Sequence, residues 1–272
     1  MSLEAPLGTE WNMKLRIFKI VRYVFYTFYT SITEGYAYHA SALTYSFTMV
    51  LGSLLLFSSF FASFLPFFDF NKLINYTVLF FPKQTEKVIF EIMKFYSHRT
   101  SGSVFSLILA YFFSVSFSKD LHKAFLYTLS EEQSEKEWAF WIKTPLVVIA
   151  YTLVISLFFI VSSLLKAYLG NHAVYLFYLI NFFAIFSLTV IIYALFLPKK
   201  YTFTDVYPGA FFTSTCLLAL NKVFSIFVVK FVKLNPLYGF MGSVLMFFIW
   251  INLSFTLILA GAKFIKLMKE EK

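Results

Sequence analysis

Charged residues and cysteine are both scarce in this chain, and each shortage excludes a class of protein. Asp, Glu, Lys and Arg make up only 14% of the residues, whereas an ordinary soluble domain has roughly 25%. The single cysteine, Cys216, excludes an intramolecular disulfide and a cysteine-based metal site. Glycine-rich phosphate loops, His-x-x-x-His pairs and Cys–His clusters are also missing. We therefore expect no catalytic residues, no bound metal and no cofactor.

Hydrophobic residues, by contrast, make up 60% of the 272 residues, and the mean hydropathy is +0.75. A soluble globule of this length could not bury 39 Phe and 18 Tyr, whereas a lipid bilayer can surround them. The net charge of +9 does not indicate nucleic acid, because the basic residues stand mostly at the ends of apolar runs. Lysine and arginine in such places contact anionic lipid headgroups, so we expect membrane lipids as partners and no nucleic acid.

The apolar runs predict an all-α, polytopic fold. We expect one integral-membrane domain over residues 1–272 with six transmembrane helices, each near the length of about 20 residues that a bilayer crossing needs. The expected spans are 43–66, 101–118, 145–165, 173–197, 206–229 and 237–262. Amphipathic helices at the membrane surface are expected at about 14–33 and 71–98.

The first of these surface helices has a predicted apolar side and a predicted basic side. The apolar side holds Ile17, Ile20, Val21, Val24 and Phe28, and the basic side holds Lys14, Arg16, Lys19 and Arg22. A plain, positively flanked entry into the first span explains the same residues nearly as well. The side of the predicted membrane that holds both termini has 14 basic residues, and the other side has 8. The positive-inside rule therefore predicts that both termini are cytoplasmic.

Lys222 is the strongest candidate for a functional residue, because it interrupts the fifth span. An isolated lysine at the centre of a membrane helix costs about 2.5–3.5 kcal/mol, so a partner or a watery cavity is expected. The alternative is a lysine that snorkels to the interface or pairs structurally with a neighbouring helix. Asn221 and Asn252 are the other candidates at depth, with helix packing as their alternative role. Weaker candidates, for the mouth of a cavity, are His39, Glu34 and Asp120; Glu34 and Asp120 also suit solvated flanks.

Small residues recur where helices could approach closely. They are Gly209 with Thr213, Gly239 with Ser243, and the run Ala260–Ala262.

Four segments resemble the YihY/BrkB family of bacterial inner-membrane proteins. They are AYHASALTYSFTMVLGSLLLFSS (37–59), SKDLHKAFL (118–126), DVYPGAFFTSTCLLALNKVFSIFVV (205–229) and PLYGFMGSVLMFFIWINLSFTLILAGAKF (236–264). The resemblance implies six membrane helices with both termini in the cytoplasm, and Lys222 matches a lysine of relatives. Three positions depart from the family pattern: Lys263 replaces the Glu of Gly-Ala-Glu, Ser53 a Pro, and Leu218 a Glu. The family has also been labelled ribonuclease BN, but no motif in this sequence supports nuclease activity.

Two functions are compatible with these features. The first is a transporter or flippase-like protein of the bacterial inner membrane for an amphipathic, anionic, lipid-like molecule, as proposed roles of relatives in envelope lipid transport imply. Lys222 would then bind the anionic head. The alternative is a non-catalytic scaffold for envelope biogenesis, in which segments 70–99 and 119–143 bind partner proteins. An intramembrane enzyme is disfavoured because no nucleophile–base pair is visible.

Overall fold

The computed structural model describes residues 7–64, 103–132, 135–169, 174–234 and 239–270. In these ranges every regular element is an α-helix. The helices are α1 (Leu7–Thr33), α2 (Tyr36–Phe64), α5 (Ser103–Leu129), α6 (Glu137–Leu169), α7 (Val174–Phe196), α8 (Phe203–Leu234) and α9 (Gly239–Glu270). The predicted all-α class is confirmed for this part of the chain. The predicted surface helix at 71–98 lies outside the described residues.

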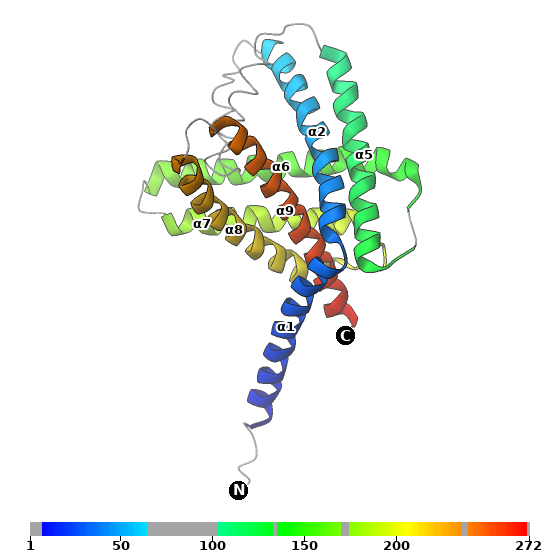
Figure 1. Cartoon of the computed structure of the whole chain (residues 1–272), viewed down its shortest axis with the longest axis vertical. Helices are drawn as coiled ribbons and strands as arrows, with labels where there is room; N and C mark the ends of the chain where they lie inside the picture. Colours follow the sequence, from blue (N-terminus) through cyan, green and yellow to red (C-terminus); the bar gives the residue numbers. More distant parts are fainter. Residues whose placement is uncertain (1–6, 65–102, 133–134, 170–173, 235–238, 271–272) are drawn as a thin grey trace.

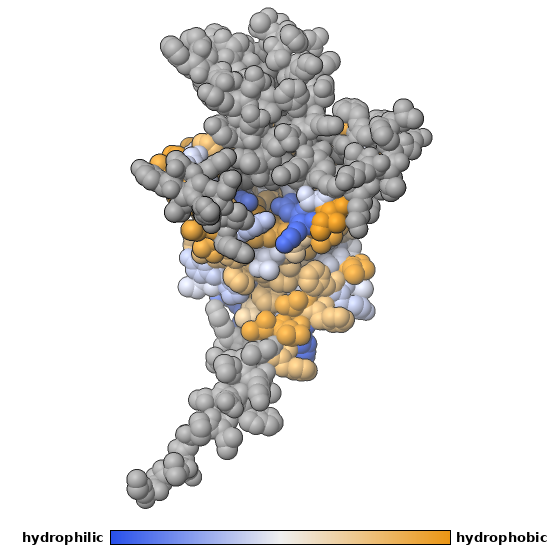
Figure 2. All heavy atoms as spheres, turned by 90° about the vertical axis from the view of Figure 1, so that its left-hand side faces the viewer, coloured by the Kyte–Doolittle hydropathy of each residue, from blue (hydrophilic) through white to orange (hydrophobic). Residues whose placement is uncertain are grey.

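Four of the described helices are long and apolar enough to cross a membrane. These stretches are Glu137–Leu165, Leu176–Phe196, Phe203–Ile226 and Val244–Glu270, in α6, α7, α8 and α9. They correspond to the last four predicted spans. On the face drawn in Figure 2, hydrophobic residues prevail in the described part, with a few hydrophilic residues among them. The first two predicted spans lie mainly in α2 and α5, which are not among the four.

α5 and α6 extend beyond the second and third predicted spans into the charged connection between them, where several of the charges are paired. α5 continues past residue 118, and α6 begins two turns before Pro145. The intervening charges meet across the α5–α6 connection: Lys119 lies 3.1 Å from Glu137, and Lys143 lies 2.5 Å from Glu135. Paired charges can stay helical at a bundle surface, and most of the charged segment 119–143 is helix.

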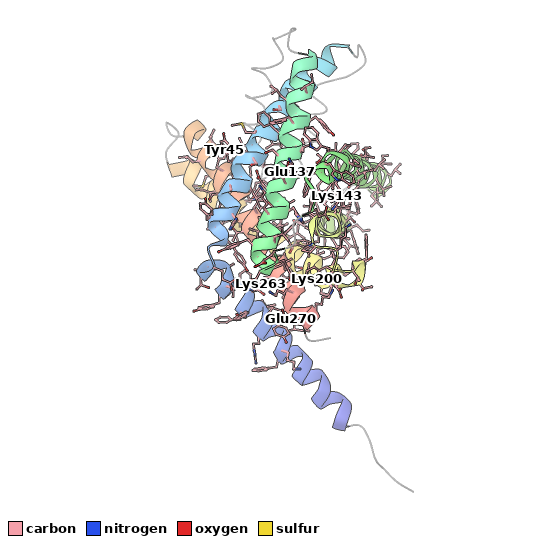
Figure 3. All side chains as sticks on the ribbon, turned by 90° about the vertical axis from the view of Figure 1, so that its right-hand side faces the viewer. Tyr45, Glu137, Lys143, Lys200, Lys263 and Glu270 are labelled. Atoms are coloured by element: carbon pink, nitrogen blue, oxygen red, sulfur yellow. The ribbon has the colours of Figure 1, made fainter. Side chains whose placement is uncertain are left out.

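α9 lies at the centre of the bundle. It packs against α8, α2, α1 and α5. α2 and α5 run side by side. α6 and α7 run across this pair in Figure 1 and are seen nearly end-on in Figure 3, which is turned by 90°. The core between these layers contains fully buried aromatic and aliphatic side chains from α2, α5, α7 and α9, including Tyr36, Phe125, Tyr193, Leu259 and Ile265. α1 projects from one end of the bundle (Figure 1).

Gly35 separates α1 from α2. Its φ of 72° is in the left-handed region, which glycine adopts without the steric cost of a Cβ. The N–H of Glu34 still donates to the carbonyl of Thr30, and the N–H of Tyr38 donates to the carbonyl of Gly35. The chain therefore changes direction within two residues while its backbone groups stay bonded.

The faces of α1 differ in part from the predicted ones. Tyr23 and Val24 pack against a small core of Phe212, Ala260 and Phe264. Val21, which was predicted on the same side as Val24, is exposed. A hydropathy pattern shows that a helix has two sides, but it does not show which side meets the protein when the other side can meet lipid.

Two predicted small-residue contacts bring α8 and α9 together. A Cβ added to Gly209 would collide with Ile265 and would lie 2.8 Å from the carbonyl oxygen of Gly261. A Cβ added to Gly261 would collide with the hydroxyls of Thr213 and Tyr193. The prediction of close approach is therefore confirmed at Gly209, Thr213 and Gly261. The pair Gly239–Ser243 lies outside the residues whose side chains are described.

Candidate functional site

Lys222 lies on the outer side of α8. Its side chain is exposed, and so are its neighbours Ala219, Val223 and Ile226. Within the described ranges the structure gives its ammonium group no hydrogen bond and no ion pair. The lysine follows Asp205, in the first turn of α8, by 17 residues, or about 25 Å of helix. It is thus a cation on an apolar outer surface, far along the helix from its charged start.

The two asparagines hold helices together on different sides of α9. The side-chain oxygen of Asn221 accepts a hydrogen bond of 2.8 Å from the indole N–H of Trp250, which links α8 to α9. The amide of Asn252 donates to the hydroxyl of Ser41 at 2.9 Å, which links α9 to α2. The structure therefore does not gather Lys222, Asn221 and Asn252 around one point in its described part.

Glu34 and Lys263 form an ion pair at the bend between α1 and α2, which sequence reasoning missed. The Nζ of Lys263 lies 3.1 Å and 3.2 Å from the two carboxylate oxygens of Glu34. Tyr36 donates its hydroxyl proton to the same carboxylate at 3.0 Å, and Tyr127 donates to the backbone carbonyl of Glu34 at 3.1 Å. Lys263 is buried, with 8% of its surface exposed, so its charge needs this partner.

The sequence did contain one signal for this pair. Lys263 stands where the resemblance implies a glutamate, and an inverted charge at a buried position requires an opposite charge nearby. Nothing in the spacing, however, points to Glu34, which is 229 residues away.

The other two weaker candidates, His39 and Asp120, lie on the seam between α2 and α5. The ring of His39 on α2 packs 4.1 Å, centroid to centroid, from the ring of Tyr127 on α5. Asp120 on α5 accepts a hydrogen bond of 2.5 Å from Ser46 on α2. Their role at a cavity mouth stays a prediction, and the contacts described here are contacts between two helices.

Charged side chains gather at the end of the bundle where α9 terminates. Lys269 lies 3.2 Å from Asp205 and contacts the carbonyl of Lys200, and Lys200 pairs with Glu131. Figure 3 shows Lys200, Lys263 and Glu270 toward this end. The ammonium groups of Lys200 and Lys269 both lie over the ring of Tyr201. Burial is the main cause that raises the pKa of the Tyr201 phenol, and nearby carboxylates raise it further. These contacts tie the α5–α6 connection and the α7–α8 turn to α9.

His122 is a second buried polar residue that sequence reasoning missed. Only 1% of its surface is exposed. Its Nδ1 lies 2.7 Å from the carbonyl oxygen of Phe196, and its Nε2 accepts the backbone N–H of Glu135 at 3.4 Å. Both contacts are satisfied by a neutral ring with the proton on Nδ1. The histidine thus joins the end of α7 to the connection before α6.

We expect His122→Leu to lower the free energy of unfolding by about 1–3 kcal/mol, because the Phe196 carbonyl would lose its donor in a buried place. Thermal unfolding in detergent, followed by circular dichroism, measures this. Lys123→Leu, at the exposed neighbouring position, is the control and should change little. Equal effects of the two substitutions would contradict the assignment.

Among the described residues, no group of three or more His, Cys, Asp or Glu side chains could hold a metal ion.

Comparison with known proteins identifies a family. The family model described as Virulence factor BrkB matches residues 28–272, which is nearly the whole chain. No curated protein and no solved structure matches this chain. The resemblance seen in the four sequence segments is confirmed by this match. With its long apolar helices, the chain is a membrane protein and belongs to the BrkB family.

Proposed function

We propose that this protein moves an amphipathic, anionic, lipid-like molecule across the bacterial inner membrane. One observation carries the proposal: Lys222 is a cation without an ion-pair partner in the described structure, and it stands on the exposed, apolar side of a helix that can cross a membrane. Keeping a charge in such a place is expensive, and ionisable residues inside membranes are generally functional.

The exposure of Lys222 supports contact with the anionic head of a lipid whose acyl chains stay in the bilayer. An ammonium group already paired with a carboxylate would first have to give up that partner, whereas Lys222 has no such partner among the described residues. The bond between Asn221 and Trp250 holds this part of α8 against α9, so the lysine is presented from a fixed helix. Asn252 belongs to the α2 side and does not contribute to this contact.

The proposal includes a placement in the membrane. α2, α5, α6, α7, α8 and α9 cross it, α1 lies at its surface, and both termini are cytoplasmic. The concentration of lysines at the end of the bundle that holds Lys200, Lys263 and Lys269 supports this orientation. The proposed activity needs no catalytic residue and no cofactor.

Lys222→Met is expected to reduce translocation of an anionic fluorescent lipid in reconstituted vesicles roughly tenfold or more, because hydrogen bonds to charged groups contribute about 1.5–3 kcal/mol. Translocation of a zwitterionic lipid serves as the internal comparison. Lys199→Met is the control variant, since Lys199 is an exposed lysine in the α7–α8 turn. Unchanged rates for Lys222→Met, at normal expression, would contradict transport and favour the scaffold role.

A further inference from the structure

The outer side of α1 is a stripe of large apolar residues. Five of them recur at intervals of three or four residues, and each has more than half of its surface exposed: Phe18 70%, Val21 60%, Phe25 76%, Tyr29 58% and Ile32 83%. We call this set the α1 stripe. Such spacing places all five on one side of the helix, and no other described element covers them.

The opposite side of α1, which meets the bundle, is rich in hydroxyl groups. Thr27, Thr30 and Ser31 are buried. The hydroxyl of Thr30 donates to the carbonyl of Thr27 at 3.1 Å, and that of Ser31 donates to the carbonyl of Phe28 at 2.7 Å. A surface helix in water buries its apolar side and exposes its polar side. α1 does the reverse over these residues, so its outer side is suited to a hydrophobic medium.

The charge of α1 identifies that medium. In sequence, its first sixteen residues contain Lys14, Arg16, Lys19 and Arg22 against the single acid Glu10. Arg22 is exposed, and its position on the helical wheel lies next to that of Tyr29, at one edge of the α1 stripe. Apolar residues with flanking basic residues bind the headgroup layer of anionic lipids. A second copy of the same helix would bring like charges together, which disfavours pairing between copies.

We infer that α1 lies in the headgroup layer of an anionic membrane, with the α1 stripe turned toward the acyl chains and Arg22 toward lipid phosphates. This rests on the membrane placement given with the proposed function. It differs from the sequence prediction in the side that meets lipid, since Val24 and Tyr23 contact the protein instead.

Nitroxide labels test this in the full chain, reconstituted in nanodiscs of phosphatidylcholine and phosphatidylglycerol. Single cysteines replace Phe18, Phe25 or Ile32 in a Cys216→Ser background, and Lys136→Cys, in the exposed α5–α6 connection, is the aqueous control. We expect labels on the α1 stripe to collide more with oxygen than with a water-soluble nickel complex, at depths of roughly 5–10 Å. Lys136→Cys should show the opposite preference.

Arg22→Gln should raise the detached fraction of α1 about fivefold, as expected for the loss of one basic contact with an anionic surface. Removing phosphatidylglycerol, which weakens the contacts of all the basic residues of α1, should raise this fraction further. Preferential collision with nickel would overturn the inference. So would spin–spin broadening between copies, or indifference to both phosphatidylglycerol and Arg22. None of these measurements involves transport, so their failure is distinguishable from the failure of the Lys222 proposal.

Discussion

Replacing Gly261 with valine is expected to lower the free energy of unfolding by about 3–5 kcal/mol, the sum of an overpacking cost and lost buried hydrogen bonds. Gly261 lies where α8 and α9 touch, and a Cβ there would collide with the hydroxyls of Thr213 and Tyr193. Those hydroxyls are bonded to each other at 2.6 Å, and Tyr193 also donates to the carbonyl of Ile258 at 2.7 Å. The added methyl groups would therefore separate the helices and leave buried polar groups unpaired.

The matched control is Gly242→Val, because a Cβ at Gly242, on the same helix, meets nothing within 4 Å. Both variants lose the same glycine flexibility and gain the same side chain, so the difference between them isolates the helix contact. Unfolding by sodium dodecyl sulfate, followed by tryptophan fluorescence, measures it. Equal unfolding midpoints for the two variants would contradict the packing described here.

The α8–α9 contact was predictable from sequence, because its rule is local. Small residues spaced four apart, such as Gly209 and Thr213, lie on one side of a helix and let a neighbour approach closely. Helical class and membrane association were predictable for the same kind of reason. Long apolar runs can satisfy their backbone groups in lipid only as helices or closed barrels.

Partner choice was not predictable, because it depends on tertiary structure. Glu34 resembled a solvated flank, and Lys263 resembled one of several basic residues near the C-terminus. Only the packing of α9 against the α1–α2 bend reveals that they meet. The orientation of α1 was hidden for another reason. Thr30 and Ser31 bond to the backbone of their own helix, and this allows polar residues to face the protein.

For Lys222, the position along the helix was predictable, but the direction of the side chain was not. Its position in the sequence predicted a costly charge at depth, and the expected remedy was a partner or a watery cavity. The described structure shows neither a bonded partner nor proximity to Asn252. What sequence could not supply is the direction of the side chain, which depends on which side of α8 packs against α7 and α9.

Breaking the pair of Glu34 and Lys263 should have the second large effect. Lys263→Met removes the cation while Glu34 stays beside α9, and Glu34→Gln leaves a buried ammonium group without its counter-charge. We expect each single substitution to cost about 2 kcal/mol, the value typical of hydrogen bonds to charged groups. The full cost of a deeply buried pair does not apply, because 38% of the Glu34 side chain is exposed and screened by its surroundings.

The reversed pair, Glu34→Lys with Lys263→Glu, decides whether the interaction itself matters. If the ion pair fixes the angle between α1 and the bundle, the double variant should recover at least half of the stability that the two single reversals lose. Thermal unfolding of the wild type, the two single reversals and the double reversal gives the coupling energy as a double-mutant cycle. A coupling near zero would mean that Lys263 is held by its other neighbours, and that Gly35 and the packing of Tyr36 alone determine how α1 leaves the bundle.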